Sequence, residues 1–172
     1  MTRIIKITLT MIIFFIIGCE DEAGNNNEMV VHEITTSNVS KGPFHFNLIN
    51  VEPDSSTWHL LYQNIDVPFG GSTYKMPSFS LHNSVMLTVD NSSKFEEIDQ
   101  SPSPSSFTSE EGRMQYGGKN AALLYDMANH KVMTSKETYI VYCTVTHKVF
   151  KIYFDEYSGG VVLFRYAELP GN

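Results

Sequence analysis

The stretch that decides the fold is Thr138–Tyr166, where three runs of strand-forming residues follow one another. The first run, TYIVYCTV at 138–145, is almost entirely β-branched or aromatic. The second, VFKIYFD at 149–155, and the third, VVLFRY at 161–166, place bulky apolar side chains at alternate positions. Such alternation is typical of strands. Because Ser-Gly-Gly at 158–160 supplies a turn, the sequence predicts a three-strand antiparallel meander with one face on a core.

Upstream of the meander the sequence offers further short strands between turn residues. We expect them at 30–35, 44–48, 58–63 (with an extension to 65–67), 78–81, 85–89 and 121–125. Only one helical turn is expected, at 95–98, and no heptad or long amphipathic helix is present. The pattern predicts an all-β fold for 30–172, an antiparallel β-sandwich or barrel-like single domain of short strands that ends in the meander.

The charge balance is acidic, with 12 basic against 19 acidic residues among 172 and a net charge of −7. Removal of residues 1–18 would leave 10 basic and 19 acidic groups, because Arg3 and Lys6 lie in that segment. Phosphate backbones and anionic lipid surfaces attract positive protein surfaces. The composition therefore argues against nucleic acid and against direct binding to anionic lipid headgroups.

The N-terminus has the parts of an export signal. Arg3 and Lys6 precede a mostly apolar run of eleven residues at 7–17, which is too short to span a bilayer, and Gly18-Cys19 follows. This resembles a bacterial lipobox, so we expect a lipoprotein signal peptide at 1–18 and lipid attachment at Cys19. A plain signal peptide or a membrane anchor is the alternative.

The residues after Cys19 are polar and acidic, and we expect 19–29 to be a flexible tether. Acidic residues at this place resemble the surface-export signal of Bacteroidota lipoproteins. They predict a lipid anchor in the outer membrane, with the domain at the cell surface.

Enzyme motifs are absent from the sequence. The segment Gly70–Tyr74 lacks the final glycine of a nucleophile elbow, and His32–Thr36 lacks the second histidine of a zincin. Cys143 lies inside the first run of the meander, where a buried, unreactive thiol is expected. We therefore predict a protein that is not an enzyme.

Several segments, spaced in the same order along the chain, resemble one known family. They are Phe44–Leu48 before Trp58, Phe95–Ile98 before Pro104 and Phe107, Leu124–Asp126 before His130–Val132 and Tyr139–Val141, and the closing pair Phe150–Phe154 and Val162–Tyr166. From Val30 onward the chain resembles the HmuY family, haem-binding lipoproteins of Bacteroidota. It departs from the family pattern at His59, at Thr146-His147 and in the short stretch between Pro104 and Ala122.

The resemblance implies a surface lipoprotein that binds haem and passes it to a TonB-dependent outer-membrane receptor. The alternative is a HmuY-like lipoprotein with a degenerate haem site, which would serve as a binding or accessory module for another ligand or a partner protein. An envelope enzyme is the third possibility, and it would require a cleft with convergent titratable groups.

Members of that family hold haem iron between two His or Met side chains from separate loops, and both donor types suit haem iron. The resemblance places one ligand at Met127, with Met114 as first choice for the second and His130 as a weaker candidate. The alternative for each methionine is local packing, since methionine fills gaps readily. For His130 the alternative is a hydrogen bond to the loop backbone. No metal other than haem iron is expected.

Overall fold

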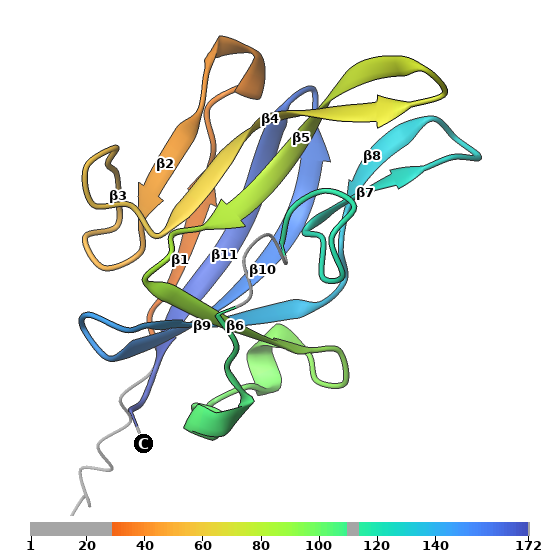
Figure 1. Ribbon diagram of the computed structural model, residues 1–172. Helices are drawn as coiled ribbons and strands as arrows, with labels where there is room; N and C mark the ends of the chain where they lie inside the picture. The colour runs from red at the N-terminus through yellow and green to blue at the C-terminus, as the bar shows by residue number, and fades with distance from the viewer. Residues whose placement is uncertain (1–28, 110–113, 172) are drawn as a thin grey trace, which may run out of the picture.

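The computed structural model describes residues 29–109 and 114–171 (Figure 1). The predicted signal peptide, the lipid-attachment residue Cys19 and the tether up to residue 28 lie outside the described residues. Within the described part of the chain, no helix is long and apolar enough to cross a membrane.

Short and medium-length strands dominate the structure, with three single 3-10 turns between them. The strands are β1 (Val31–Thr35), β2 (Phe44–Asn47), β3 (Glu52–Pro53), β4 (Leu60–Phe69), β5 (Ser72–Leu81), β6 (Val85–Asp90), β7 (Leu123–Asp126), β8 (Lys131–Thr134), β9 (Thr138–Cys143), β10 (Lys148–Ser158) and β11 (Val161–Leu169), and the turns are η1 (Val39–Lys41), η2 (Phe95–Glu97) and η3 (Pro104–Ser106).

The strands form two large antiparallel sheets and one separate hairpin. One sheet has the order β1-β11-β10-β9-β6 and the other has the order β3-β2-β4-β5, while β7 and β8 pair only with each other. The predicted meander is confirmed, because β9, β10 and β11 lie side by side in chain order. The all-β prediction is also confirmed, with sheets that are not closed into a barrel.

The core lies between the inner faces of the two large sheets. Its largest fully buried side chains include Tyr62 and Phe79 from one sheet and Tyr139, Phe154 and Phe164 from the other. The rings of Phe79 and Phe154 meet across the interface, with centroids 4.5 Å apart. Aromatic pairs of this kind stabilise a fold beyond the area that they bury. The alternation in the meander therefore supplies half of a sandwich core.

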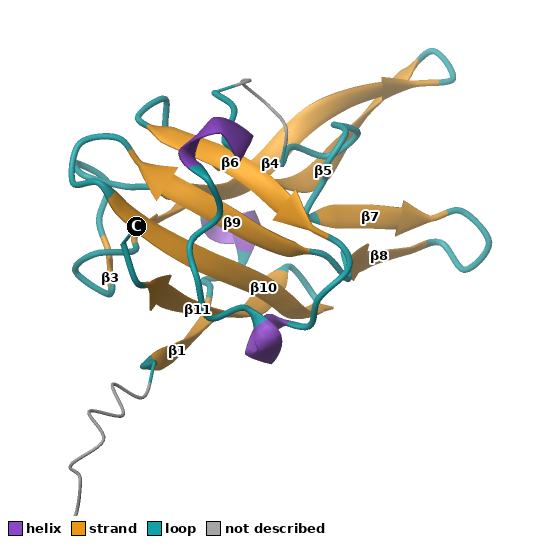
Figure 2. Ribbon diagram, turned by 90° about the horizontal axis from the view of Figure 1, so that it is seen from below, coloured by secondary structure: helices purple, strands orange, loops and turns teal. Residues whose placement is uncertain are grey.

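The outer face of the meander sheet is covered as well. The segment 91–109, which contains η2 and η3, crosses that face (Figure 2) and buries a second apolar cluster. Lys151, on the outer face of β10, is only 3% exposed as a result. Its Nζ donates to the carbonyl oxygens of Phe95 and Ile98, each at 2.7 Å, and lies 4.3 Å from the Phe95 ring centroid. Burial lowers the pKa of this ammonium.

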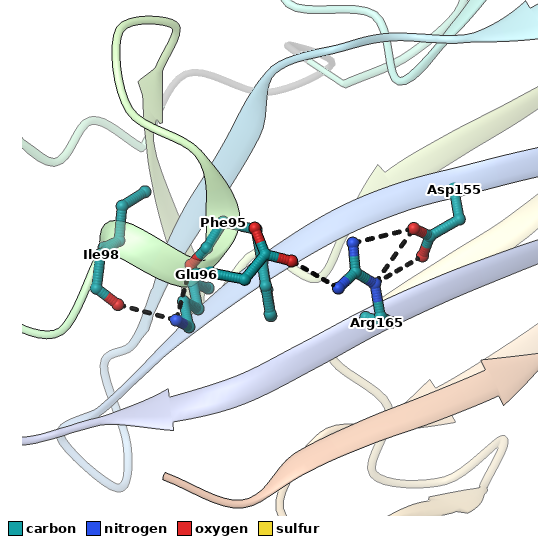
Figure 3. Close-up of polar contacts among 6 residues, drawn as sticks. Phe95, Glu96, Ile98, Asp155 and Arg165 are labelled. Atoms are coloured by element: carbon teal, nitrogen blue, oxygen red, sulfur yellow. Dashed lines mark hydrogen bonds and ion pairs between the residues drawn. The ribbon is translucent and has the colours of Figure 1, made fainter.

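An arginine joins the same segment to the meander (Figure 3). The Arg165 guanidinium donates through Nε to both carboxylate oxygens of Asp155, at 3.0 and 3.1 Å, and through Nη1 to Glu96 at 2.7 Å. The hydrogen bond from Arg165 is the main reason that the pKa of Glu96 is lowered. Polar contacts thus fix η2 on the sheet from two strands.

Several strands differ from the sequence expectation. The β4–β5 hairpin is longer than predicted, because β5 already begins at Ser72, directly after the turn at Gly70-Gly71. Pro77 lies within β5, which is tolerated because β5 is at the edge of its sheet. Strands β3 and β8 are absent from the sequence expectation.

The turn between β10 and β11 yields a prediction about two adjacent glycines. Gly159 and Gly160 have φ values of 56° and 88°. A Cβ at Gly160 would lie 2.9 Å from the Asn38 side-chain oxygen, whereas a Cβ at Gly159 would meet nothing within 4 Å. Alanine at either position has the left-handed strain of about 1–2 kcal/mol, and Gly160→Ala adds the clash. We expect Gly160→Ala to lower the free energy of unfolding more than Gly159→Ala in urea titrations; equal losses would contradict this.

A second prediction concerns pH and His59. Its Nδ1 accepts a hydrogen bond from the Leu48 N–H at 3.3 Å. Burial, with a smaller contribution from His82, lowers the pKa of His59 below its ordinary value of 6.5. The unfolded chain therefore binds the proton more readily, and stability is lost as the pH falls below 6.5 toward the folded pKa. We expect the urea concentration at the unfolding midpoint to decrease when the pH is lowered from 7.5 to 5. The decrease should be smaller in His59→Asn. An equal fall in both proteins would exclude His59 as the cause.

Candidate functional site

The outer half of the β4–β5 hairpin is apolar on one face and polar on the other. Val67 pairs with Tyr74 and therefore points to the same side of the hairpin, and Phe69 and Met76 lie two residues along on that side. The opposite face carries an ion pair between Lys75 and Asp66 at 2.9 Å. Phe69 is 65% exposed and Tyr74 is 52% exposed. A contiguous patch of exposed apolar side chains often marks a binding surface, whereas single scattered ones do not.

The β7–β8 hairpin projects on the same side of the molecule as β4–β5 (Figure 1). Asp126 fixes the turn that joins β7 to β8, since its carboxylate accepts from the Ala128 N–H at 2.9 Å and from the Asn129 amide at 2.6 Å. These hydrogen bonds lower the pKa of Asp126, and the one from the Asn129 side chain has the largest effect. The turn closes at His130, which has a φ of 53° and whose Nδ1 is 3.1 Å from the Tyr125 hydroxyl oxygen. Met127 is thus held at the start of a rigid turn.

The two hairpins enclose a groove of about 370 Å³. One wall comes from β4–β5, the other comes from β7–β8 and its turn, and Tyr116 from the loop before β7 completes the lining. The volume falls in the range of small-molecule sites, which are mainly apolar with a few polar groups. The lining side chains are aliphatic, aromatic or sulfur-containing apart from one imidazole: Val67, Phe69, Tyr74, Met76, Tyr116, Tyr125, Met127 and His130. No carboxylate, lysine or arginine is among them.

The structure brings together two of the three predicted ligand residues. Met127 and His130 both line the groove, and Met127 is 62% exposed. Met114 does not line it. That residue is 1% exposed and packs in the sandwich core, where its carbonyl oxygen accepts from the Ala122 N–H at 3.1 Å. The structure therefore does not bring the Met114 thioether to the groove with Met127.

Sequence reasoning missed the residues of the β4–β5 wall. Apolar residues alternate on both sides of Gly70-Gly71, with Val67 and Phe69 before the turn and Tyr74 and Met76 after it. That pattern, with two glycines at its centre, is the signal of a hairpin with one apolar face. This apolar alternation continues beyond the part of the hairpin that packs in the sandwich core. It therefore indicated that the outer half of the hairpin has a second apolar surface.

The Tyr125–His130 contact also has a counterpart elsewhere in the fold. At the β9–β10 turn, the Tyr142 hydroxyl oxygen lies 2.6 Å from Nδ1 of His147, whose φ is 58°. In both places histidine closes a turn in the left-handed region, and its ring is tied to the tyrosine five residues earlier. The pair is therefore a turn-stabilising device. What distinguishes the β7–β8 turn is Met127 and the apolar groove beside it.

The donor set of the groove fits haem. Thioether sulfur and imidazole nitrogen are both established axial donors for haem iron, and flat aromatic walls suit a macrocycle. The Nδ1 contact with Tyr125 fixes the His130 ring in the way that outer hydrogen bonds usually fix a metal-binding imidazole. Within residues 29–109 and 114–171, no group of three or more His, Cys, Asp or Glu side chains could hold a metal ion.

Cys143 plays no part in this site. It is buried in the core, and burial raises the pKa of its thiol to about 12. The prediction of a buried Cys143 is therefore confirmed, and its thiol stays protonated at neutral pH.

Because the sequence comparisons found no match, the functional argument rests on the residues of the groove. The sequence matches no protein-family model, and it matches no curated protein either.

Proposed function

We propose that this protein captures haem in the groove between the β4–β5 and β7–β8 hairpins, as a carrier without catalytic turnover. The observation that carries the proposal is the position of Met127 and His130 on one wall of an otherwise apolar, aromatic groove. The resemblance to the HmuY family adds the setting: a lipid-anchored protein at the cell surface that passes haem to a TonB-dependent receptor.

The groove residues have separate tasks in this proposal. Tyr74, Tyr116 and Tyr125 supply ring faces and edges for the macrocycle, and Met127 supplies a sulfur to the iron. When bound, haem contributes an iron whose axial positions accept such donors. Because the groove is lined by no charged side chain, polar substituents of the ligand would face solvent. Met127, which is 62% exposed, would hold the iron through its sulfur, and release would require that contact to be lost.

A second candidate function is capture of another flat, apolar ligand in the same groove. Two observations favour it. Met114 is buried, and Met127 and His130 belong to the same turn. Two donors from one turn approach a ring from the same side. If no side chain of the opposite wall bound the iron, the groove would hold a macrocycle mainly through its apolar faces.

The test is a titration followed by visible absorbance, with haem and with metal-free protoporphyrin. The variants are Val67→Glu, which places a charge in the groove, and Val145→Glu, at the 77% exposed tip of the β9–β10 turn. Haem capture predicts saturation at one haem per chain, lost in Val67→Glu and kept in Val145→Glu, with weaker binding of the metal-free ring. Equal affinity for both rings would favour the second candidate. A broad band identical in all three proteins would indicate adsorption and refute both.

A further inference from the structure

We infer that Met76, on the β4–β5 wall, is the donor to the second axial position of the iron. This inference rests on the proposed haem capture and names a residue outside the two turns that the sequence suggested. Four observations lead to it.

The first observation is that the two walls of the groove come from different hairpins. Axial donors to haem iron approach from opposite faces of the ring. Met127 and His130 come from one turn of the β7–β8 hairpin, so only one face is served from that side. A donor for the other face has to come from elsewhere in the lining, to which the β4–β5 wall contributes four side chains and the loop before β7 contributes Tyr116.

The second observation is the chemistry of that wall. Of its four lining side chains, Val67 and Phe69 carry no donor atom, which leaves Tyr74 and Met76. A phenol coordinates iron as the phenolate and must first lose a proton, whereas a thioether has no proton to lose and binds as it is. Sulfur is therefore the donor that is available at neutral pH.

The third observation is position along the hairpin. Met76 pairs with Ile65 and is half-buried, while Tyr74 lies nearer the tip and is 52% exposed. A donor at the half-buried level places the ring centre inside the groove and leaves Tyr74 to cover the ring. The converse arrangement would place the iron at the exposed tip.

The fourth observation is the fixed course of the strand at Met76. β4 and β5 pair without a register shift from Leu60 and Leu81 to Phe69 and Ser72. The neighbouring Ser78 hydroxyl accepts from the Tyr116 N–H at 2.9 Å, which ties the loop that carries Tyr116 to this wall. Met76 therefore projects from a rigid strand, as a preorganised donor should.

The test compares Met76→Leu with Tyr74→Phe in the ferric haem complex, by visible absorbance and electron paramagnetic resonance. Met76→Leu conserves volume and removes the sulfur, so we expect at least about tenfold weaker binding and a change from six-coordinate low-spin to five-coordinate high-spin iron. Tyr74→Phe keeps the ring and removes only the hydroxyl, so it tests Tyr74 as the alternative donor. Met133→Leu, at an exposed methionine on the face of β8 away from the groove, is the control that should keep the low-spin spectrum. Met76→His should restore six-coordination through an imidazole, which controls for loss of packing.

The outcomes separate this inference from the proposal beneath it. A Met76→Leu complex that stays six-coordinate and low-spin, with unchanged affinity, would overturn the assignment of Met76 while leaving haem capture intact. Absence of saturable haem binding by the unmodified protein would overturn both. Loss of low-spin character in Tyr74→Phe but not in Met76→Leu would assign the second donor to Tyr74 instead.

Discussion

Met127→Ala is expected to weaken haem binding about 100-fold, which corresponds to about 2.8 kcal/mol. The substitution removes the sulfur donor and leaves the apolar contacts of the groove. Because Met127 is 62% exposed, its truncation should not change the free energy of unfolding. The affinity is measured by titration of the Soret band, and the stability by urea denaturation.

The same hairpin supplies the matched control. Met133 is 45% exposed on β8 and pairs with Leu124, on the face of the hairpin that does not line the groove. Met133→Ala should bind haem as tightly as the unmodified protein does. Equal weakening by both substitutions would mean that haem adsorbs to exposed methionines, and equal affinity of Met127→Ala and the unmodified protein would remove Met127 from the site.

The largest expected effect on stability belongs to Lys151→Ala. The substitution leaves the carbonyl oxygens of Phe95 and Ile98 buried without their present donor, and it removes the cation from the Phe95 ring. A buried polar group without a partner costs about 1–3 kcal/mol. We expect the free energy of unfolding to fall by about 3 kcal/mol, as measured by urea denaturation.

Lys148→Ala is the control for Lys151. Lys148 lies at the start of the same strand and forms an exposed ion pair with Glu168 at 2.7 Å. Exposed pairs contribute about 0–1 kcal/mol, so Lys148→Ala should shift the urea midpoint little. Similar losses for the two lysines would show that the contacts of Lys151 with η2 do not stabilise the fold.

The meander could be predicted because its signal is local. Side chains at alternate positions of β10 and β11 face the same core, and the turn at Gly159-Gly160 has the glycines that its positive φ angles require. The burial of Lys151 could not be predicted in this way. Alternation shows that Lys151 lies opposite the core face, but the segment that covers it has no periodic pattern of its own.

The candidate site was predicted in part for a similar reason. Met127 stands out in a short polar turn, where a methionine has no packing task. Met114 has similar neighbours in the sequence, yet the fold places it in the core. The β4–β5 wall was missed because the groove depends on how two hairpins far apart in the chain lie relative to each other, which is a tertiary property.

The central claim is that haem lies in the groove against Met127, and methionine-methyl NMR tests it most directly. The protein has eight methionines, with Met127 in the groove, Met133 on the outer face of the hairpin and Met114 in the core. With haem reduced to its diamagnetic low-spin state, the macrocycle ring current should shift the ε-methyl signal of Met127 strongly and leave those of Met133 and Met114 nearly unchanged. An unshifted Met127 signal in a saturated complex would contradict the account.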